Sequence, residues 1–233
     1  MVQTSDQNIV AVVPMRAGSK GLPGKNIHRL AGKPLYQHTL DAAAAADVTQ
    51  TIITTDLTDL DLTGQDRVSC VQRAAHLALD TTPMAAVLSD LLTNAIFDDA
   101  TIVLLQVTSP LRQAADILGA ISMYDQQQHD LVMSVCEAPR SVLKYGTLSG
   151  ADYVPMRQAD DLFANRQELP AVYRPNGSVY VFSAAWYRAN GSLATDKIGA
   201  YLMTPETSID IDTLDDLAEC EKTLTHMKKE AST

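Results

Sequence analysis

The sequence contains few cysteines. Cys70, Cys136 and Cys220 are the three cysteines among 233 residues, and they lie far apart with no CxxC spacing. An odd number of widely spaced cysteines argues against a disulfide framework and against a zinc site. We therefore expect free thiols in a reducing cytoplasm.

Long apolar runs and an excess of basic residues are also missing. No apolar run approaches the ~20 residues of a membrane-spanning helix, and the polar start MVQTSDQN lacks the basic-then-apolar layout of a signal peptide. The 28 acidic residues outnumber the 18 Lys and Arg residues, which gives a net charge of −10. We expect a soluble cytoplasmic protein that binds neither nucleic acid nor an anionic membrane surface.

What the sequence does have is 46% hydrophobic residues, which is enough for a core, in a length that suits one medium domain. Short apolar runs alternate with helix-length segments, and this alternation predicts an α/β fold with a mostly parallel sheet wound by helices on both faces. The expected strands are 9–14, 51–56, 68–73, 101–107, 130–137, the first part of 178–189, and 198–203. The expected helices are 34–47, 83–96, 114–128, the second part of 178–189, and 214–229.

Residues 139–170 break this alternation. They are polar and rich in Arg and Asp, and they show no clear periodicity. Because long segments of this kind are usually functional or interfacial, we expect this one to serve a site or an interface.

The first candidate site is the loop VVPMRAGSKGLPGKN (12–26), which follows the first expected strand. Its glycines do not fit the Walker A or the G-x-G-x-x-G spacing. No acid occurs from Gln7 to Leu40, and the loop holds Arg16, Lys20 and Lys25. Glycine lets backbone N–H groups approach an anion, and Arg and Lys add charge, so a phosphate or nucleotide site is favoured over a merely structural turn.

The second candidate site is SIDIDT (208–213), in which Asp210 and Asp212 alternate with isoleucines. On an extended segment both carboxylates face one side, where their repulsion favours a cation between them. Mg²⁺ suits one or two carboxylates together with substrate phosphates. The alternative is that Asp212 caps the helix that follows.

Two further polar clusters lie at ends of expected strands. LLQVTSPLR (104–112) contains Gln106, Ser109 and Arg112, and YRPNGSVYV (173–181) contains Arg174, Asn176 and Tyr180. Ligands of open α/β sheets bind outside the carboxyl ends of the strands. For the second cluster, a turn with surface arginines is the alternative reading.

Together these stretches resemble the bacterial CMP-sialic acid synthetases, or acylneuraminate cytidylyltransferases. The resemblance covers the chain from about Ile9 to the last helix, with the motifs in the order of the family. The matching motifs are RAGSKGLPGKN, RAAHLALDTTPM, LLQVTSPLR, YVPMR, RQELP, YRPNGSVY and SIDIDTLDDL.

The resemblance implies a Rossmann-like nucleotidyltransferase domain over residues 1–233. A dimerisation and sugar-site insertion is expected around 139–200, and it implies a homodimer in which the partner subunit completes the sugar site. The implied reaction joins CTP to a nine-carbon 2-keto sugar acid, giving a CMP-sugar and pyrophosphate. The implied cofactor is Mg²⁺.

The resemblance also implies roles for particular residues. The nucleotide-binding positions are Arg16, Ser19, Lys20, Lys25, Asn26 and Arg73. The sugar-binding positions are Gln106, Lys144, Arg166, Arg174, Asn176 and Tyr180. The metal carboxylates are Asp210 and Asp212. Catalysis by positioning and charge is expected from Arg16, Lys25 and Asp212.

Three departures from the family pattern bear on this expectation. The region GSLATDKIG (191–199) has no aromatic residue where the family's partner subunit contributes two, His76 replaces a Glu, and Val107 replaces a proline. The missing aromatics leave the sugar open: N-acetylneuraminate comes first, and legionaminate or another nonulosonic acid is the alternative. A nucleotide-sugar glycosyltransferase and a catalytically silent nucleotide-binding module are the rival functions.

Overall fold

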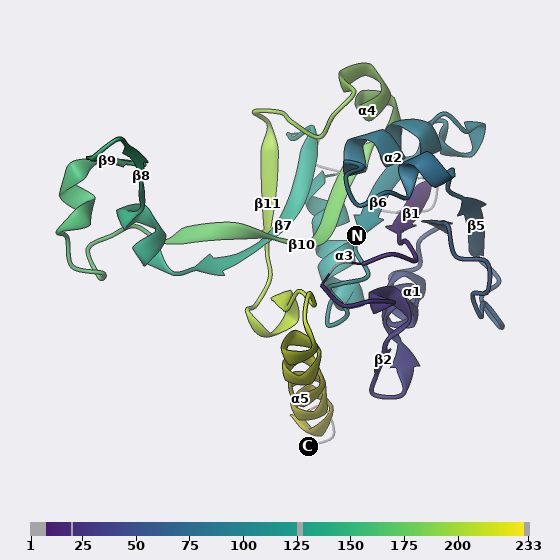
Figure 1. The fold of residues 1–233 in the computed structure, drawn as a ribbon. Coiled ribbons are helices and arrows are strands. Elements are labelled where there is room, and N and C mark those ends of the chain that lie inside the picture. Colours follow the sequence, from purple (N-terminus) through teal and green to yellow (C-terminus); the bar gives the residue numbers. More distant parts are fainter. Residues whose placement is uncertain (1–7, 20, 125–127, 231–233) are drawn as a thin grey trace.

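A computed structural model describes residues 8–19, 21–124 and 128–230. Its centre is a seven-stranded sheet built largely from β-branched and other apolar residues (Figure 1). The strands are β1 (Ile9–Pro14), β4 (Gln50–Thr55), β5 (Val68–Gln72), β6 (Thr101–Leu105), β7 (Leu131–Ala138), β10 (Val172–Ser183) and β11 (Ile198–Leu202). Their spatial order is β11-β7-β10-β6-β1-β4-β5.

The sheet is parallel except at β10. Neighbouring pairs among β6, β1, β4 and β5 run parallel, as do β11 and β7. β10 lies between β6 and β7 and is antiparallel to both. The prediction of a mostly parallel sheet is confirmed. Because β1, β4, β5 and β6 point the same way, the loops that follow them gather at one edge.

Helices cover both faces of the sheet, as predicted. Along β1, Ala11 and Val13 pack with residues of α1 (Leu35–Ala45), α3 (Ala114–Tyr124) and α5 (Leu214–Glu230). Val10 and Val12 point to the opposite face and pack with residues of α2 (Met84–Leu91) and α4 (Ala184–Asn190). The alternation of a strand's side chains thus gives the domain two apolar layers, one on each face.

Two expected elements differ from the structure, and a third is confirmed over the part that the structure describes. The predicted helix 83–96 is wrong in its second half, because α2 ends at Leu91 and the Asn94 side chain accepts a hydrogen bond from the Ile96 N–H to begin a separate 3-10 helix. The predicted strand 101–107 leaves the sheet after Leu105. The predicted helix 114–128 is confirmed as far as Tyr124, and residues 125–127 lie outside the described residues.

Residues 139–171 form an extension that projects from the main sheet at the outer ends of β7 and β10 (Figure 1). The segment expected to be irregular contains an antiparallel hairpin flanked by two 3-10 helices. These elements are η4 (Arg140–Lys144), β8 (Gly146–Ser149), β9 (Asp152–Pro155) and η5 (Ala159–Leu162). The projecting part is shorter than the predicted insertion, because residues 178–202 form a strand, a helix and an edge strand of the main body.

The remaining elements are short. They are η1 (Lys25–Ile27), β2 (Arg29–Leu30), β3 (Lys33–Pro34), η2 (Ala75–Leu77), η3 (Ala95–Phe97) and η6 (Glu206–Ser208). Within the three described ranges, every helix falls short of the length and apolar character that a membrane crossing requires.

Candidate active site

The glycine-rich loop (residues 15–24) leaves β1 at the carboxyl edge of the sheet and is fixed by its main chain. The Met15 N–H donates to the Thr54 carbonyl at 3.0 Å, and the Ala17 N–H donates to Asp56 Oδ1 at 2.8 Å. Nδ2 of Asn26, a buried residue, donates to the Arg16 carbonyl at 2.8 Å. The loop is therefore braced from both sides, with Asn26 shaping its backbone.

This loop meets the acidic segment from the far end of the chain. The Lys25 ammonium lies 2.8 Å from Asp212 Oδ1. The backbone of Gly21 packs so closely against Asp212 that a Cβ at position 21 would lie 2.6 Å from the Asp212 carbonyl oxygen. Glycine is required at this contact because it has no Cβ. The structure thus brings together the two stretches that the sequence analysis singled out independently.

The acidic segment shows the expected alternation. Ile211 is buried and its N–H donates to the Thr108 carbonyl at 2.8 Å, while Asp210 and Asp212 both reach solvent, although the Asp210 carboxyl is partly covered. Partial burial of the Asp210 carboxyl raises its pKa, and the nearby negative charge of Asp212 raises it further, whereas a hydrogen bond with Thr108 opposes the shift. Both carboxylates therefore lie at the carboxyl edge of the sheet, next to the loop that follows β6.

The alternative role of Asp212 as a helix cap is wrong. Thr213 caps α5 by accepting the Asp216 N–H at 3.2 Å, and Asp216 Oδ2 accepts the Thr213 N–H at 2.7 Å in return. This reciprocal pattern is a capping box. The Asp212 side chain is left to face Lys25.

The two carboxylates fit a metal that takes its remaining ligands from a substrate. The described ranges contain no group of three or more His, Cys, Asp or Glu side chains that could hold a metal ion by themselves. Mg²⁺ commonly uses one or two carboxylates, with phosphate oxygens and water as its other ligands. The donor set of Asp210 and Asp212 suits that arrangement better than an all-protein site.

A cleft of about 280 Å³ opens beside the loop. Six residues predicted from the sequence line it: Arg16, Ser19, Lys25, Asn26, Arg73 and Gln106. Five of them were expected to bind the nucleotide, and Gln106 was expected to bind the sugar. Lys20, the remaining nucleotide candidate, lies outside the described residues.

The cleft carries two arginines with different surroundings. Arg16 Nη1 pairs with Asp80 Oδ1 at 2.5 Å on the rim. Arg73 is buried, and its Nη2 donates to the Thr54 carbonyl at 2.9 Å, while its Nε has no partner among the described residues. Burial lowers the pKa of Arg73, and the nearby Arg16 charge lowers it further, against the opposing effect of Asp56. A buried N–H donor without a partner is suited to an incoming acceptor.

Sequence reasoning missed much of the cleft wall. The residues concerned are Leu77, Leu79, Asp80, Thr82, Met84, Val87 and Thr108. Most belong to the RAAHLALDTTPM stretch or to the start of α2, whose apolar residues have the spacing of ordinary core positions. The sequence offered one indication that these residues line the site: most of them closely follow Arg73, which was expected to bind the nucleotide.

The predicted sugar-binding residues fall into three groups. Gln106 lines the cleft, and Arg174 and Tyr180 lie within electrostatic reach of Asp210. The pKa of Tyr180 is raised by burial first and by the Asp210 charge second. Asn176 is 2% exposed and lies inside the domain rather than in the cleft.

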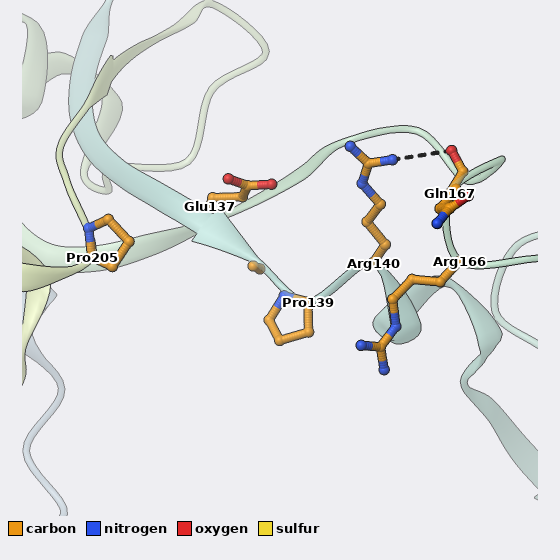
Figure 2. Close-up of a pocket in the computed structure, with 7 residues that line it drawn as sticks. Glu137, Pro139, Arg140, Arg166, Gln167 and Pro205 are labelled. Carbon is orange, nitrogen blue, oxygen red and sulfur yellow. Dashed lines mark hydrogen bonds between the residues drawn. The ribbon is translucent and has the colours of Figure 1, made fainter.

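Lys144 and Arg166 form the third group, at the extension. Lys144 Nζ donates to the Ala164 carbonyl at 2.6 Å. Arg166 lines a separate, open cavity of about 630 Å³ with Glu137 and Arg140. Figure 2 shows Arg140 turned toward the Gln167 carbonyl, with the Arg166 guanidinium pointing in a different direction. The structure does not bring these two residues into the cleft of the same chain.

Several known proteins are similar to this chain. Residues 10–227 match a sequence family described as Cytidylyltransferase. The chain is 35% identical over 212 residues to an N-acylneuraminate cytidylyltransferase from Streptococcus agalactiae serotype III, covering 89% of this chain and 51% of that relative. It is also 35% identical over 240 residues to a CMP-N,N'-diacetyllegionaminic acid synthase from Legionella pneumophila, covering 96% and 98% of the two chains. The chain thus spans about half the length of the first of these relatives and nearly all of the second.

The fold has solved counterparts. A structure of a CMP:2-keto-3-deoxy-manno-octonic acid synthetase complexed with CTP aligns with a TM-score of 0.70 at 15% identity, covering 95% of this chain and 100% of that one. A 4-diphosphocytidyl-2C-methyl-D-erythritol synthase from Anaerococcus prevotii aligns with a TM-score of 0.64 at 14% identity, covering 94% and 99% of the two chains. At these identities the likeness shows the shared α/β fold.

Proposed function

Because the chain belongs to the cytidylyltransferase family, we propose that it joins CTP to a nonulosonic acid, giving a CMP-sugar and pyrophosphate. The observation that carries the proposal is the meeting of the glycine loop with the acid pair beside the cleft, where Lys25 contacts Asp212. A triphosphate placed in this cleft would lie between the cationic loop and the carboxylates.

In the proposed reaction, the anomeric hydroxyl oxygen of the acid attacks the α-phosphorus of CTP. A new P–O bond forms, the bond between the α-phosphorus and the bridging oxygen breaks, and pyrophosphate leaves with its electron pair. The proton of the hydroxyl passes to a base or to solvent. Such transfers depend on positioning and on stabilisation of charge.

The residues of the chain supply both requirements. Arg16 and Lys25 hold the triphosphate and offset the charge that grows on pyrophosphate, with Ser19, Lys20 and the loop backbone as further donors. Asp210 and Asp212 would hold Mg²⁺, which supplies positive charge at the phosphate oxygens when bound. The cytosine and ribose would lie against the apolar lining of the cleft, which includes Leu77 and Leu79 as well as Arg73.

N-acetylneuraminate is the first proposed acid, and Gln106, Arg174 and Tyr180 are the residues proposed to contact it. N,N'-diacetyllegionaminic acid is the second. It is favoured by the relative that matches this chain along nearly its whole length, and by the absence of aromatic residues from 191–199.

We further propose that the protein is a cytoplasmic homodimer whose sugar site is completed by the partner subunit. The extension supports this proposal because it exposes large apolar side chains, with Leu148 at 75%, Met156 at 69% and Phe163 at 88%. Exposed apolar clusters of this kind mark interaction surfaces. Lys144 and Arg166 lie at the same extension, so in a dimer they could serve the partner's cleft.

The deciding experiment incubates the protein with CTP, Mg²⁺ and each member of a panel of nonulosonic acids, and measures pyrophosphate. Release of pyrophosphate that requires both CTP and one acid supports the proposal, and the preferred acid identifies the substrate. No release with any acid, together with tight CTP binding, would instead support a silent nucleotide-binding module. Consumption of a CMP-sugar with transfer to an acceptor would support a glycosyltransferase.

A further inference from the structure

A chain of buried polar side chains runs beneath the candidate site. Its members come from α1, the loop after β6, β7, β10 and η6, and each is at most 3% exposed. They are Thr39, Arg112, Ser134, Asn176, Ser178 and Ser208. Buried polar groups are costly unless they are hydrogen-bonded, so a network of this size is expected to fix local geometry.

Asn176 is the centre of this network, and its amide is fully used. Oδ1 accepts from Ser134 Oγ at 2.6 Å and from the Ser178 N–H at 3.2 Å. Nδ2 donates to Ser208 Oγ at 2.8 Å and to Met203 Sδ at 3.3 Å. An amide offers two donor hydrogens and two acceptor lone pairs. Asn176 therefore has no capacity left for a substrate unless one of these bonds breaks.

Arg112 continues the network on the other side of Ser178. Its Nη1 donates to the Ser178 carbonyl at 2.6 Å and to the Gln106 carbonyl at 3.2 Å, and its Nη2 donates to Thr39 Oγ1 at 3.0 Å. Burial lowers the pKa of Arg112 to about 9, which still leaves the guanidinium charged at neutral pH. Burying a cation whose hydrogen-bond partners are neutral oxygens costs free energy of desolvation. We therefore expect Arg112 to have a structural role.

The two ends of the network reach the two halves of the site. At one end, Arg112 donates a hydrogen bond to the Gln106 carbonyl, and the Gln106 side chain lines the cleft. This side chain also packs against Gly177: a Cβ on that glycine would lie 3.5 Å from Oε1 of Gln106. At the other end Ser208, bonded to Asn176 and to the Thr204 carbonyl at 2.7 Å, lies two residues before Asp210. The network thus connects the floor of the cleft with the acidic segment.

We propose that Asn176 and Arg112 are positioning residues that fix Gln106 relative to the Asp210 segment, and that Asn176 does not bind the sugar directly. The inference rests on the proposed function and refines it, because the resemblance assigns Asn176 to the sugar. A positioning role and a ligand role give different kinetic results, since only a direct ligand should act through the KM of the acid alone.

The test compares Asn176→Ala and Ser208→Ala with the wild-type protein, and uses Ser183→Ala as the matched control. Ser183 Oγ accepts the Trp186 N–H at 3.3 Å, and Ser183 pairs with Thr101 at the opposite edge of the sheet. Two readouts are taken: steady-state constants for CTP and for the preferred acid, and Mn²⁺ affinity in the presence of CTP by electron paramagnetic resonance. The second readout needs no turnover.

We expect both network variants to weaken Mn²⁺ binding and to lower kcat by about 10- to 100-fold, the range seen when groups that orient metal ligands are removed. The KM for CTP and for the acid should stay within about 2-fold, and Ser183→Ala should match the wild type in both readouts. If Asn176→Ala does not fold, Ser208→Ala and Thr39→Val, each of which removes one hydroxyl, carry the same expectation.

Other results would overturn the inference. A rise in the KM of the acid alone, with kcat and Mn²⁺ affinity unchanged, would make Asn176 a sugar ligand. The positioning role would be excluded if Ser208→Ala had the same kcat and Mn²⁺ affinity as Ser183→Ala. It would also be excluded if the wild-type protein bound no Mn²⁺ in the presence of CTP. A wild-type protein that binds Mn²⁺ and CTP but transfers nothing would contradict the proposed function alone, and the Mn²⁺ comparison would still decide this inference.

Discussion

The ammonium of Lys25 lies 2.8 Å from the carboxylate of Asp212, although 187 positions separate the two residues in the sequence. The Lys25 side chain is 13% exposed, whereas the Asp212 side chain is 72% exposed. The lysine is thus held in place by its surroundings, and the aspartate remains open to a ligand approaching from solvent.

Replacing Asp212 should stop turnover without unfolding the protein. We expect Asp212→Asn to lower kcat by roughly 100-fold, because a metal carboxylate is lost. The melting temperature should move little, since the Asp212 side chain is solvent-exposed and the amide oxygen of an asparagine can still accept a hydrogen bond from Lys25. Pyrophosphate release and thermal unfolding measure the two effects. Near-normal rates at saturating Mg²⁺ would remove Asp212 from the metal site.

Adding a methyl group at Gly21 should separate the loop from the acids. A Cβ there would lie 2.6 Å from the Asp212 carbonyl oxygen, so the backbone has to shift. We expect Gly21→Ala to lower kcat/KM for CTP by about 100-fold, the cost of a displacement near 1 Å in a reacting site. In Gly18→Ala the added Cβ meets no atom within 4 Å, and the loss should be much smaller. Equal losses in the two variants would contradict this account.

Removing Arg16 should affect the nucleotide more than the acid. Hydrogen bonds to charged groups contribute about 1.5–3 kcal/mol, so Arg16→Ala should raise the KM of CTP by about 10- to 100-fold. The KM of the acid should change far less. Arg29→Ala is the matched control, because Arg29 bonds the Gly32 carbonyl in a separate hairpin and lies outside the set of cleft-lining residues. Equal effects of Arg16→Ala on both substrates would place Arg16 elsewhere.

Charging the extension should break the proposed homodimer. Phe163→Asp and Leu148→Asp place a carboxylate on strongly exposed apolar positions of the extension, and light scattering should report half the wild-type mass. Ile96→Asp, at a 38% exposed position on the main body, should keep the wild-type mass. A wild-type protein that is already monomeric, or variants that stay dimeric, would exclude this interface.

Much of the fold could be predicted because a buried parallel strand leaves a plain signal. Strands β1, β4 and β6 are runs of apolar and β-branched residues, and both faces of each are covered. The reversed direction of β10 was not predicted, because the spacing of apolar residues is the same whichever way a strand runs in the sheet. The hairpin of the extension was also missed, because β8 and β9 are short and exposed, with no buried face to impose alternation.

The segments that form the candidate site could be predicted from the sequence, but their spatial arrangement could not. Residue types and spacing identified the loop and the acid pair, since Asp210 and Asp212 alternate with isoleucines. Their meeting required tertiary structure. Asn176 resembled an exposed group at a strand entrance, but β10 changes register between Pro175 and Tyr180, and Gly177 adopts a φ of 75°. At this irregularity the Asn176 amide points into the domain, and no pattern in the neighbouring sequence predicts that orientation.

The two parts of the candidate site come from segments that lie far apart in the sequence. Every residue lining the cleft precedes or includes Thr108, whereas both acids lie beyond residue 209. During synthesis on the ribosome, the elements that hold the nucleotide emerge about a hundred residues before the carboxylates. Under the proposed function, the nascent protein cannot turn over CTP until the segment that carries Asp210 and Asp212 has emerged and Ile211 has packed into the core, so synthesis of that segment acts as a check on activity.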